Sequence, residues 1–213
     1  MTARRSTLAL ALALAACGAD QAPAPPPTLH VASGGRFYAA TDSAGFLMAP
    51  MACGQLMGDS ATLVQVRLTT AGNVCGQAQE HAFCAEQAAA ATASLTIVRA
   101  NASGGIAPAI GPGTYASSDG NAVDENGNFM WFWSSWDRLD ASCGLLPGGP
   151  KEGGLGTVTF DEVGPTRIRG SADIAFDDGS TLSGPFDVAV CDAPGAELCA
   201  SLKGGCSSVA CVP

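Results

Sequence analysis

The chain has 213 residues, with 10 Lys and Arg against 19 Asp and Glu, so its formal net charge is −9. This acidic balance argues against a nucleic-acid partner, because phosphate binding requires a basic surface. A chain of this length forms one domain, or at most two small ones, and is long enough to bury a hydrophobic core.

The first segment has the layout of a secretory signal peptide. Arg4 and Arg5 precede an apolar run over residues 8–16, which is too short to span a bilayer. The run ends in Leu-Ala-Ala-Cys at 14–17, a motif that resembles the lipobox of bacterial lipoproteins. An ordinary signal peptide cleaved after an Ala-x-Ala site is the alternative.

The lipobox resemblance implies that residues 1–16 are removed and that Cys17 carries the lipid, palmitate among its acyl chains. The chain would then be held at a membrane in the bacterial cell envelope, as two or more acyl chains hold a protein stably. No Asp directly follows Cys17. In this family that absence favours the outer membrane over the inner one.

Residues 17–28 form the next segment. Four prolines lie between residues 23 and 27, and such a run favours an extended polyproline conformation. We expect an acylated, Pro-rich tether that holds a single folded domain, residues 29–213, away from the membrane.

Short apolar-alternating segments follow the tether. Strands are predicted at residues 29–33, 36–40, 63–70, 94–100, 114–115 and 128–134. In the third of these, Val64, Val66 and Leu68 share one face. The one plausible helix is 77–91, with an Ala-rich end, and we expect one to three helical turns at most.

The segment 117–128 is polar and is predicted to be one loop. Its end, Asp124-Glu125-Asn126-Gly127-Asn128, resembles the start of a calcium-binding EF-hand loop. Phe129 stands where that loop needs glycine, and Ser135 stands where it needs glutamate. Since Asn-Gly is also a strong hairpin turn, a turn is favoured over a calcium site.

All three tryptophans lie in the predicted strand that follows this loop. On a strand, Phe129, Trp131 and Trp133 share one face, and Met130 and Phe132 share the other. The strand is either buried on both faces or presents an exposed aromatic strip. Core packing is the ordinary role of such residues, whereas an exposed strip including Trp131, Trp133 or Trp136 would suit stacking against sugar rings.

The clearest pattern covers residues 156–190. Three strands alternate strictly, with Arg167, Arg169, Ser171 and Asp173 opposite an apolar face in the middle one. Asp177-Asp178-Gly179-Ser180 is predicted to be a hairpin turn, because Asp-Gly supplies the positive φ that tight hairpins need. The inward positions are Val158, Phe160, Ile168, Gly170, Ala172, Ile174, Phe176, Leu182, Phe186, Val188 and Val190.

These patterns predict an all-β fold. About eight or nine short strands separated by Gly, Pro, Asn and Asp turns are typical of an antiparallel β-sandwich or a barrel-like meander. Disulfides are expected to reinforce it, because an exported domain with an even number of cysteines usually oxidises them. Those eight are Cys53, Cys75, Cys84, Cys143, Cys191, Cys199, Cys206 and Cys211.

The pairing of the eight cysteines is mostly open. The bridge expected from proximity joins Cys75 to Cys84, and at least one of the last four should pair within the tail or tie it to the sheet. Cys75, His81 and Cys84 are also spaced as C-x5-H-x2-C. That is not a common zinc spacing, so no metal and no other cofactor is expected.

Four segments carry a second resemblance: Gly-Pro-Gly-Thr-Tyr at 111–115, Gly-Thr-Val-Thr-Phe at 156–160, Gly-Ser-Ala-Asp-Ile-Ala-Phe at 170–176 and Ser-Gly-Pro-Phe-Asp-Val-Ala-Val-Cys at 183–191. Together they resemble uncharacterised β-rich lipoproteins of myxobacteria and related bacteria. The resemblance spans about half of the chain and brings no catalytic residues with it.

The sequence favours a non-enzymatic role. Its two histidines, His30 and His81, are not set in a recognised catalytic motif. Adjacent carboxylates on a turn, such as Asp177 and Asp178, are usually solvated. We expect a binding or structural role in the envelope, toward a glycan or another envelope protein. A glycan-binding module is the alternative with a stated site, and a hydrolase is the weaker one.

Overall fold

The computed structural model describes residues 28–48, 61–81, 85–101, 106–117, 122–123, 126–147, 151–192 and 210–213. Within these ranges the chain forms fourteen strands and one helix. The elements are β1 (His30–Ser33), β2 (Arg36–Ala39), β3 (Asp42–Met48), β4 (Ala61–Thr69), α1 (Val74–His81), β5 (Ala85–Gln87), β6 (Ala91–Asn101), β7 (Gly113–Ala116), β8 (Ala122–Val123), β9 (Asn128–Arg138), β10 (Lys151–Glu152), β11 (Leu155–Val163), β12 (Arg167–Ala175), β13 (Thr181–Ala189) and β14 (Ala210–Val212).

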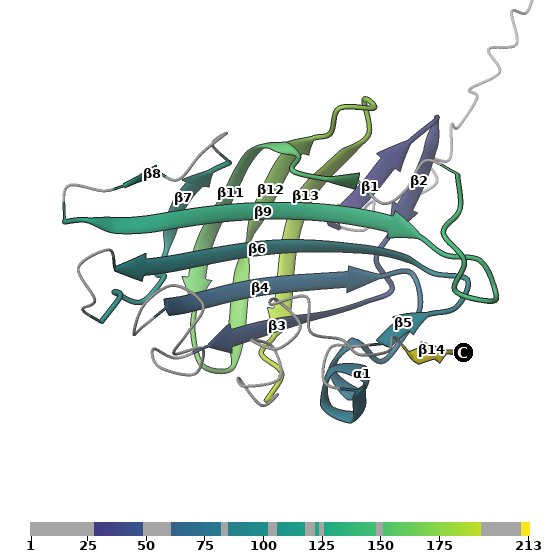
Figure 1. Ribbon diagram of the computed structural model, residues 1–213, viewed down its shortest axis with the longest axis horizontal. Helices are drawn as coiled ribbons and strands as arrows, with labels where there is room; N and C mark the ends of the chain where they lie inside the picture. The colour runs from purple at the N-terminus through teal and green to yellow at the C-terminus, as the bar shows by residue number, and fades with distance from the viewer. Residues whose placement is uncertain are drawn as a thin grey trace, which may run out of the picture.

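Two antiparallel sheets pack face to face as a sandwich. Sheet A has the strand order β2-β1-β13-β12-β11-β7, and sheet B has the order β10-β9-β6-β4-β3 with β8 beside β9. The strands of the two sheets cross steeply in Figure 1. The antiparallel β-sandwich predicted from the alternation is therefore confirmed.

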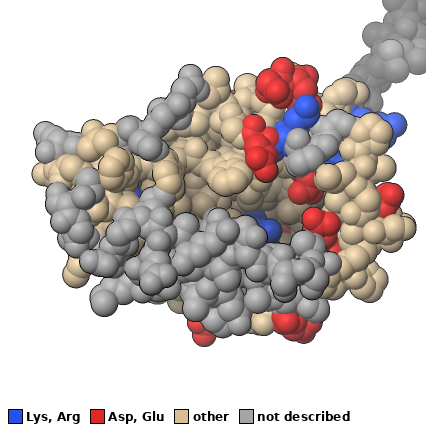
Figure 2. Space-filling view, viewed as in Figure 1, with Lys and Arg blue, Asp and Glu red and all other residues tan. Residues whose placement is uncertain are grey.

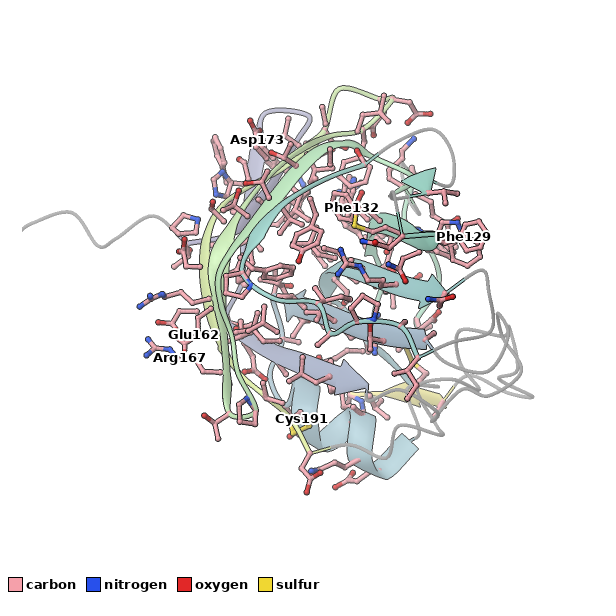
Figure 3. All side chains as sticks on the ribbon, turned by 90° about the vertical axis from the view of Figure 1, so that its left-hand side faces the viewer. Phe129, Phe132, Glu162, Arg167, Asp173 and Cys191 are labelled. Atoms are coloured by element: carbon pink, nitrogen blue, oxygen red, sulfur yellow. A yellow bond between two sulfur atoms is a disulfide. The ribbon has the colours of Figure 1, made fainter. Side chains whose placement is uncertain are left out.

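The main hydrophobic core lies between the sheets. Val66 and Ile97 from sheet B are fully buried there, as are Val158, Ile168 and Ile174 from sheet A. The alternation explains this, because successive side chains of a strand point to opposite faces. Arg167 and Glu162 project instead from the outer side of sheet A (Figure 3).

The predicted meander is the centre of sheet A. β11, β12 and β13 pair in sequence, with Val158 opposite Ala172 and Ile174 opposite Leu182. Gly170 is required where these strands meet, since a Cβ there would lie 2.0 Å from the Thr159 carbonyl oxygen. The predicted turn is also present, with Gly179 at φ 78°.

The predicted helix is wrong in its bounds. Helix α1 spans Val74–His81, and the Ala-rich segment after it forms β5 and a turn that leads into β6. The Asp42 carboxylate on β3 accepts a hydrogen bond from the Val74 backbone N–H at 2.8 Å, which fixes the start of the helix. Pairing of β5 with β14 in parallel then draws the segment out of helical geometry.

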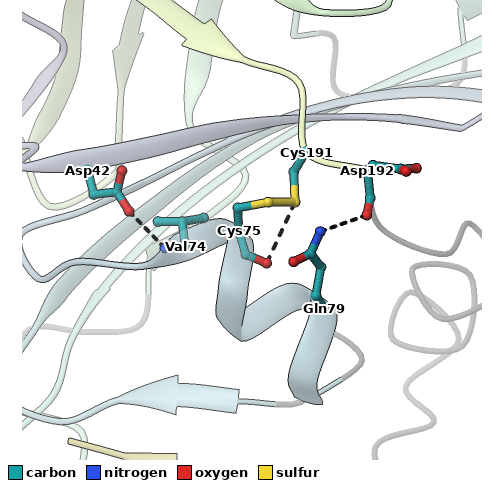
Figure 4. Close-up of a disulfide and its surroundings, with 6 residues drawn as sticks. All are labelled: Asp42, Val74, Cys75, Gln79, Cys191 and Asp192. Carbon is teal, nitrogen blue, oxygen red and sulfur yellow. Dashed lines mark hydrogen bonds between the residues drawn. A yellow bond between two sulfur atoms is a disulfide. The ribbon is translucent and has the colours of Figure 1, made fainter.

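The two disulfides in the described residues join distant parts of the chain. Cys75 at the start of α1 bonds to Cys191 after β13, not to Cys84 as proximity suggested (Figure 4). Cys143, after β9, bonds to Cys211 in β14. As expected, the tail is tied to the rest of the domain. Cys53, Cys84, Cys199 and Cys206 lie outside the described residues.

The anchor segments cannot be placed on the fold. Residues 1–27, including Cys17, also lie outside the described residues. In the part of the chain that is described, no helix has the length and apolar character needed to cross a membrane.

Candidate ligand-binding face

Strand β9 divides its aromatic residues between the two faces of sheet B. Phe132 points into the space between the sheets, and Phe129 points away from it on the far side of sheet B (Figure 3). Trp131 and Trp133 share the outward face with Phe129, because residues two apart on a strand point the same way. Trp136 has the opposite parity and points into the core.

The exposed fractions separate the three tryptophans. Trp131 is 40% exposed and Trp133 is 50% exposed, whereas Trp136 is 1% exposed. The Trp136 indole N–H donates to the Ser180 hydroxyl at 2.9 Å, which satisfies its polar atom inside the core. Trp136 therefore cannot stack against a ligand, and only Trp131 and Trp133 keep the suggested role.

The register of sheet B places polar residues beside these two indoles. Trp133 lies opposite Thr96 on β6, and Thr96 lies opposite Gln65 on β4. The Gln65 amide donates to the Thr96 hydroxyl at 3.0 Å. One step along the face, the hydroxyls of Ser94 and Ser135 are 2.8 Å apart. We call these five residues and Trp131 the tryptophan face.

The tryptophan face ends in two charged residues of opposite sign. Arg67 on β4 lies opposite Ser94, and Asp137 lies two residues beyond Ser135 on the same side of β9. Burial raises the pKa of Asp137 to about 6, and repulsion from Glu86 on β5 adds to this rise. Attraction to Arg67 lowers the same pKa, as does a hydrogen bond from the backbone of Thr92. Burial lowers the pKa of Arg67.

The surface over sheet B is hollowed. Figure 2 shows this side of the molecule, with a basic side chain in the hollow and acidic side chains along its right-hand border. Glu152 contributes to the acidity, since it is exposed and pairs with Ser135 from β10. The arrangement joins two indole surfaces to a row of hydrogen-bonding groups, a combination that suits a ligand with both apolar and hydroxylated surfaces.

The histidine available for description is engaged locally. His30 Nδ1 lies 3.0 Å from the Thr28 carbonyl oxygen, and its ring centroid lies 5.5 Å from that of Phe37. His81 ends α1, but its side chain is not among those described. No group of three His, Cys, Asp or Glu side chains in the described ranges is placed to hold a metal ion.

The adjacent carboxylates of the β12–β13 turn are also engaged. Lys151 Nζ lies 3.8 Å from Asp177 and 3.6 Å from Asp178. Asp178 also accepts hydrogen bonds from Ser180, and this bond and the others lower its pKa. These carboxylates fix the turn and do not face one another across a cleft. In the other acidic pair, Asp124 and Glu125 lie outside the described residues.

A cavity of about 430 Å³ opens beside β13, beyond the point where β1 stops pairing with it. Leu29, Leu68 and Phe186 line it on the core side. Arg169 and Asp187 line it on the outer side and lie opposite one another in the β12–β13 register. Its charges are balanced, and we assign it no ligand.

Sequence reasoning missed the residues at the polar end of the tryptophan face. Gln65 and Arg67 alternate with Val64, Val66 and Leu68 on β4, so their position on the outer side could be read from the sequence. Their closeness to β9 could not, because it depends on the order β9-β6-β4 within sheet B.

The comparisons with known proteins give no further guide to the site, as no family model, curated protein or solved structure matches this chain.

Proposed function

We propose that the chain is an envelope-anchored lipoprotein whose β-sandwich is a non-catalytic binding module for glycans. The observation that carries the proposal is the pair of exposed indoles, Trp131 and Trp133, on one face of β9. Large aromatic groups are normally buried in domains of this size. Two that stay exposed side by side mark a binding surface rather than scattered apolar residues.

The neighbours of the indoles favour a sugar over an apolar partner. An indole presents a flat apolar surface that matches the apolar side of a pyranose ring. The hydroxyls of Thr96, Ser94 and Ser135 supply donors and acceptors for sugar hydroxyls along the same row. Protein sites for small ligands combine these elements: an apolar surface and a few convergent polar groups.

The anchor is the second part of the proposal, and it is supported by the sequence around Cys17. Acylation there would hold the module at the envelope surface, where polysaccharides are present. Labelling cells with radioactive palmitate tests it. We expect label in the wild type and none in Cys17→Ser, and equal labelling of the two would refute the anchor.

Binding is tested on an array of bacterial and plant polysaccharides with the purified domain. We expect retention of at least one polysaccharide, and loss of that retention in the double variant Trp131→Ala, Trp133→Ala. Each stacked ring contributes on the order of 1 kcal/mol or more, as ring-stacking contacts in proteins do, so the double variant should bind at least tenfold more weakly.

The matched control is Phe37→Ala on β2, another aromatic side chain, which is 74% exposed. It lies in sheet A, away from the tryptophan face, and should bind like the wild type. Failure of the wild type to bind any polysaccharide, or equal loss in Phe37→Ala, would overturn the proposal.

A further inference from the structure

The polar end of the tryptophan face carries an excess of negative charge. Asp137 on β9, Glu86 on β5 and Glu152 on β10 are the carboxylates around it, and Arg67 on β4 is the cation. One positive charge against three negative ones leaves a surplus that suits a cationic group. An anionic group would meet repulsion there.

Two buried oxygen atoms on this face have no hydrogen-bond donor. Gln65 is 7% exposed, and its amide donates to Thr96, but its Oε1 accepts no hydrogen bond. Asp137 Oδ1 is buried in the same condition. Buried acceptors without a donor are costly. Both gain from a ligand that brings N–H or O–H groups.

The electrostatics of Asp137 point the same way. Its burial and the repulsion from Glu86 outweigh the attraction of Arg67, so that its pKa is raised to about 6. A second cation close to Asp137 would offset both effects, and the carboxylate is mostly ionised above that pKa and able to bind it.

From this arrangement we propose that the polar end of the tryptophan face recognises the ammonium group of an amino sugar through Asp137 and Glu152. The inference rests on the proposed glycan-binding function and names its ligand class. Trp133 and Asp137 are four residues apart on one side of β9, about 13 Å along the strand. That length accommodates an oligosaccharide with one ring on an indole and the next over Ser135.

The geometry assigns a separate task to each group. The indoles bind the apolar faces of the rings, and the serine and threonine hydroxyls bind ring hydroxyls. Asp137 and Glu152 select the charge, because Glu152 pairs with Ser135 from β10 and therefore borders the same position from the other side. An N-acetylated sugar lacks the positive charge, and a plain glucose unit has a hydroxyl in its place.

The experiment compares three oligosaccharides of equal length by calorimetry at pH 6.5: β-1,4-linked glucosamine, N-acetylglucosamine and glucose. We expect the glucosamine oligomer to bind at least tenfold more tightly than the other two. In the double variant Asp137→Asn, Glu152→Gln the three affinities should fall within about twofold of one another.

The control variant Asp173→Asn removes an exposed carboxylate from the outer side of sheet A (Figure 3). It should keep the preference, whereas a loss equal to that of the double variant would show non-specific attraction to an acidic protein and refute the inference. Equal affinity for all three oligomers would refute it and leave the proposed function standing. Binding of none of them, together with no retention on the array, would refute the proposed function as well.

Discussion

Replacing Asp137 with asparagine should stabilise the folded chain at neutral pH. The carboxyl has an ordinary pKa of 3.8 and a pKa of about 6 in the folded chain, chiefly because it is buried. Each pKa unit corresponds to about 1.4 kcal/mol, so the ionised carboxylate costs roughly 3 kcal/mol of folding free energy at pH 7.5. Asparagine resembles the neutral form and removes most of this cost.

The sign of the pH dependence follows from proton binding. Between about pH 4 and pH 6 the folded chain holds the Asp137 proton that the unfolded chain has lost, so stability falls as the pH rises through this range. Below it both states are protonated, and above it both are ionised. The advantage of Asp137→Asn should therefore shrink from about 3 kcal/mol at pH 7.5 to about 0.5 kcal/mol at pH 4.

Urea unfolding of both proteins at pH 4 and pH 7.5, with the disulfides intact, measures this difference. Asp173→Asn is the control, because Asp173 is exposed, and it should change the free energy of unfolding by less than about 0.5 kcal/mol at either pH. A variant Asp137→Asn that is less stable than the wild type at pH 7.5, or equally shifted at both pH values, would refute the reasoning.

Two further predictions concern the core and the disulfides. Ser180→Ala removes the acceptor of the buried Trp136 indole N–H and should destabilise the chain by about 1–3 kcal/mol in urea unfolding; an unchanged midpoint would contradict this role. A non-reducing peptide map should show the peptide of Cys75 linked to that of Cys191, and a link to Cys84 would contradict the fold. Replacing both Cys75 and Cys191 with alanine should lower the unfolding free energy by about 2–5 kcal/mol.

The sheets could be predicted from local pattern where one face is buried and the other is not. Strand β12 reads exposed and buried at alternate residues along its whole length, so sequence alternation located it closely. Strand β3 was missed, because Ala44, Gly45 and Phe46 are all buried there. A strand covered on both sides loses the period-two signal.

The helix and the first disulfide depended on contacts between distant segments. Helix α1 begins where the Asp42 carboxylate meets the Val74 N–H, and a partner 32 residues away leaves no local signal. The bridge from Cys75 spans 116 residues. Nearness in the sequence favoured Cys84, but the crossing of β3 and β13 at Gly45 and Val190 brings Cys191 to the start of the helix.

The candidate site was predictable in part. Parity along β9 placed Trp131 and Trp133 on one face, as the structure has them. Exposure could not be read from the sequence, since either face of β9 could have met the core. Trp136 has the parity of Phe132 and belongs to the core, a distinction that the grouping of all three tryptophans had obscured.

The most direct measurement of the central claim follows the three indole N–H signals by NMR while the glucosamine oligomer is added. Binding at the tryptophan face should shift the signals of Trp131 and Trp133 in a saturable way and leave the buried Trp136 signal in place. Saturable binding that leaves Trp131 and Trp133 unchanged, or the absence of any shift, would contradict the account.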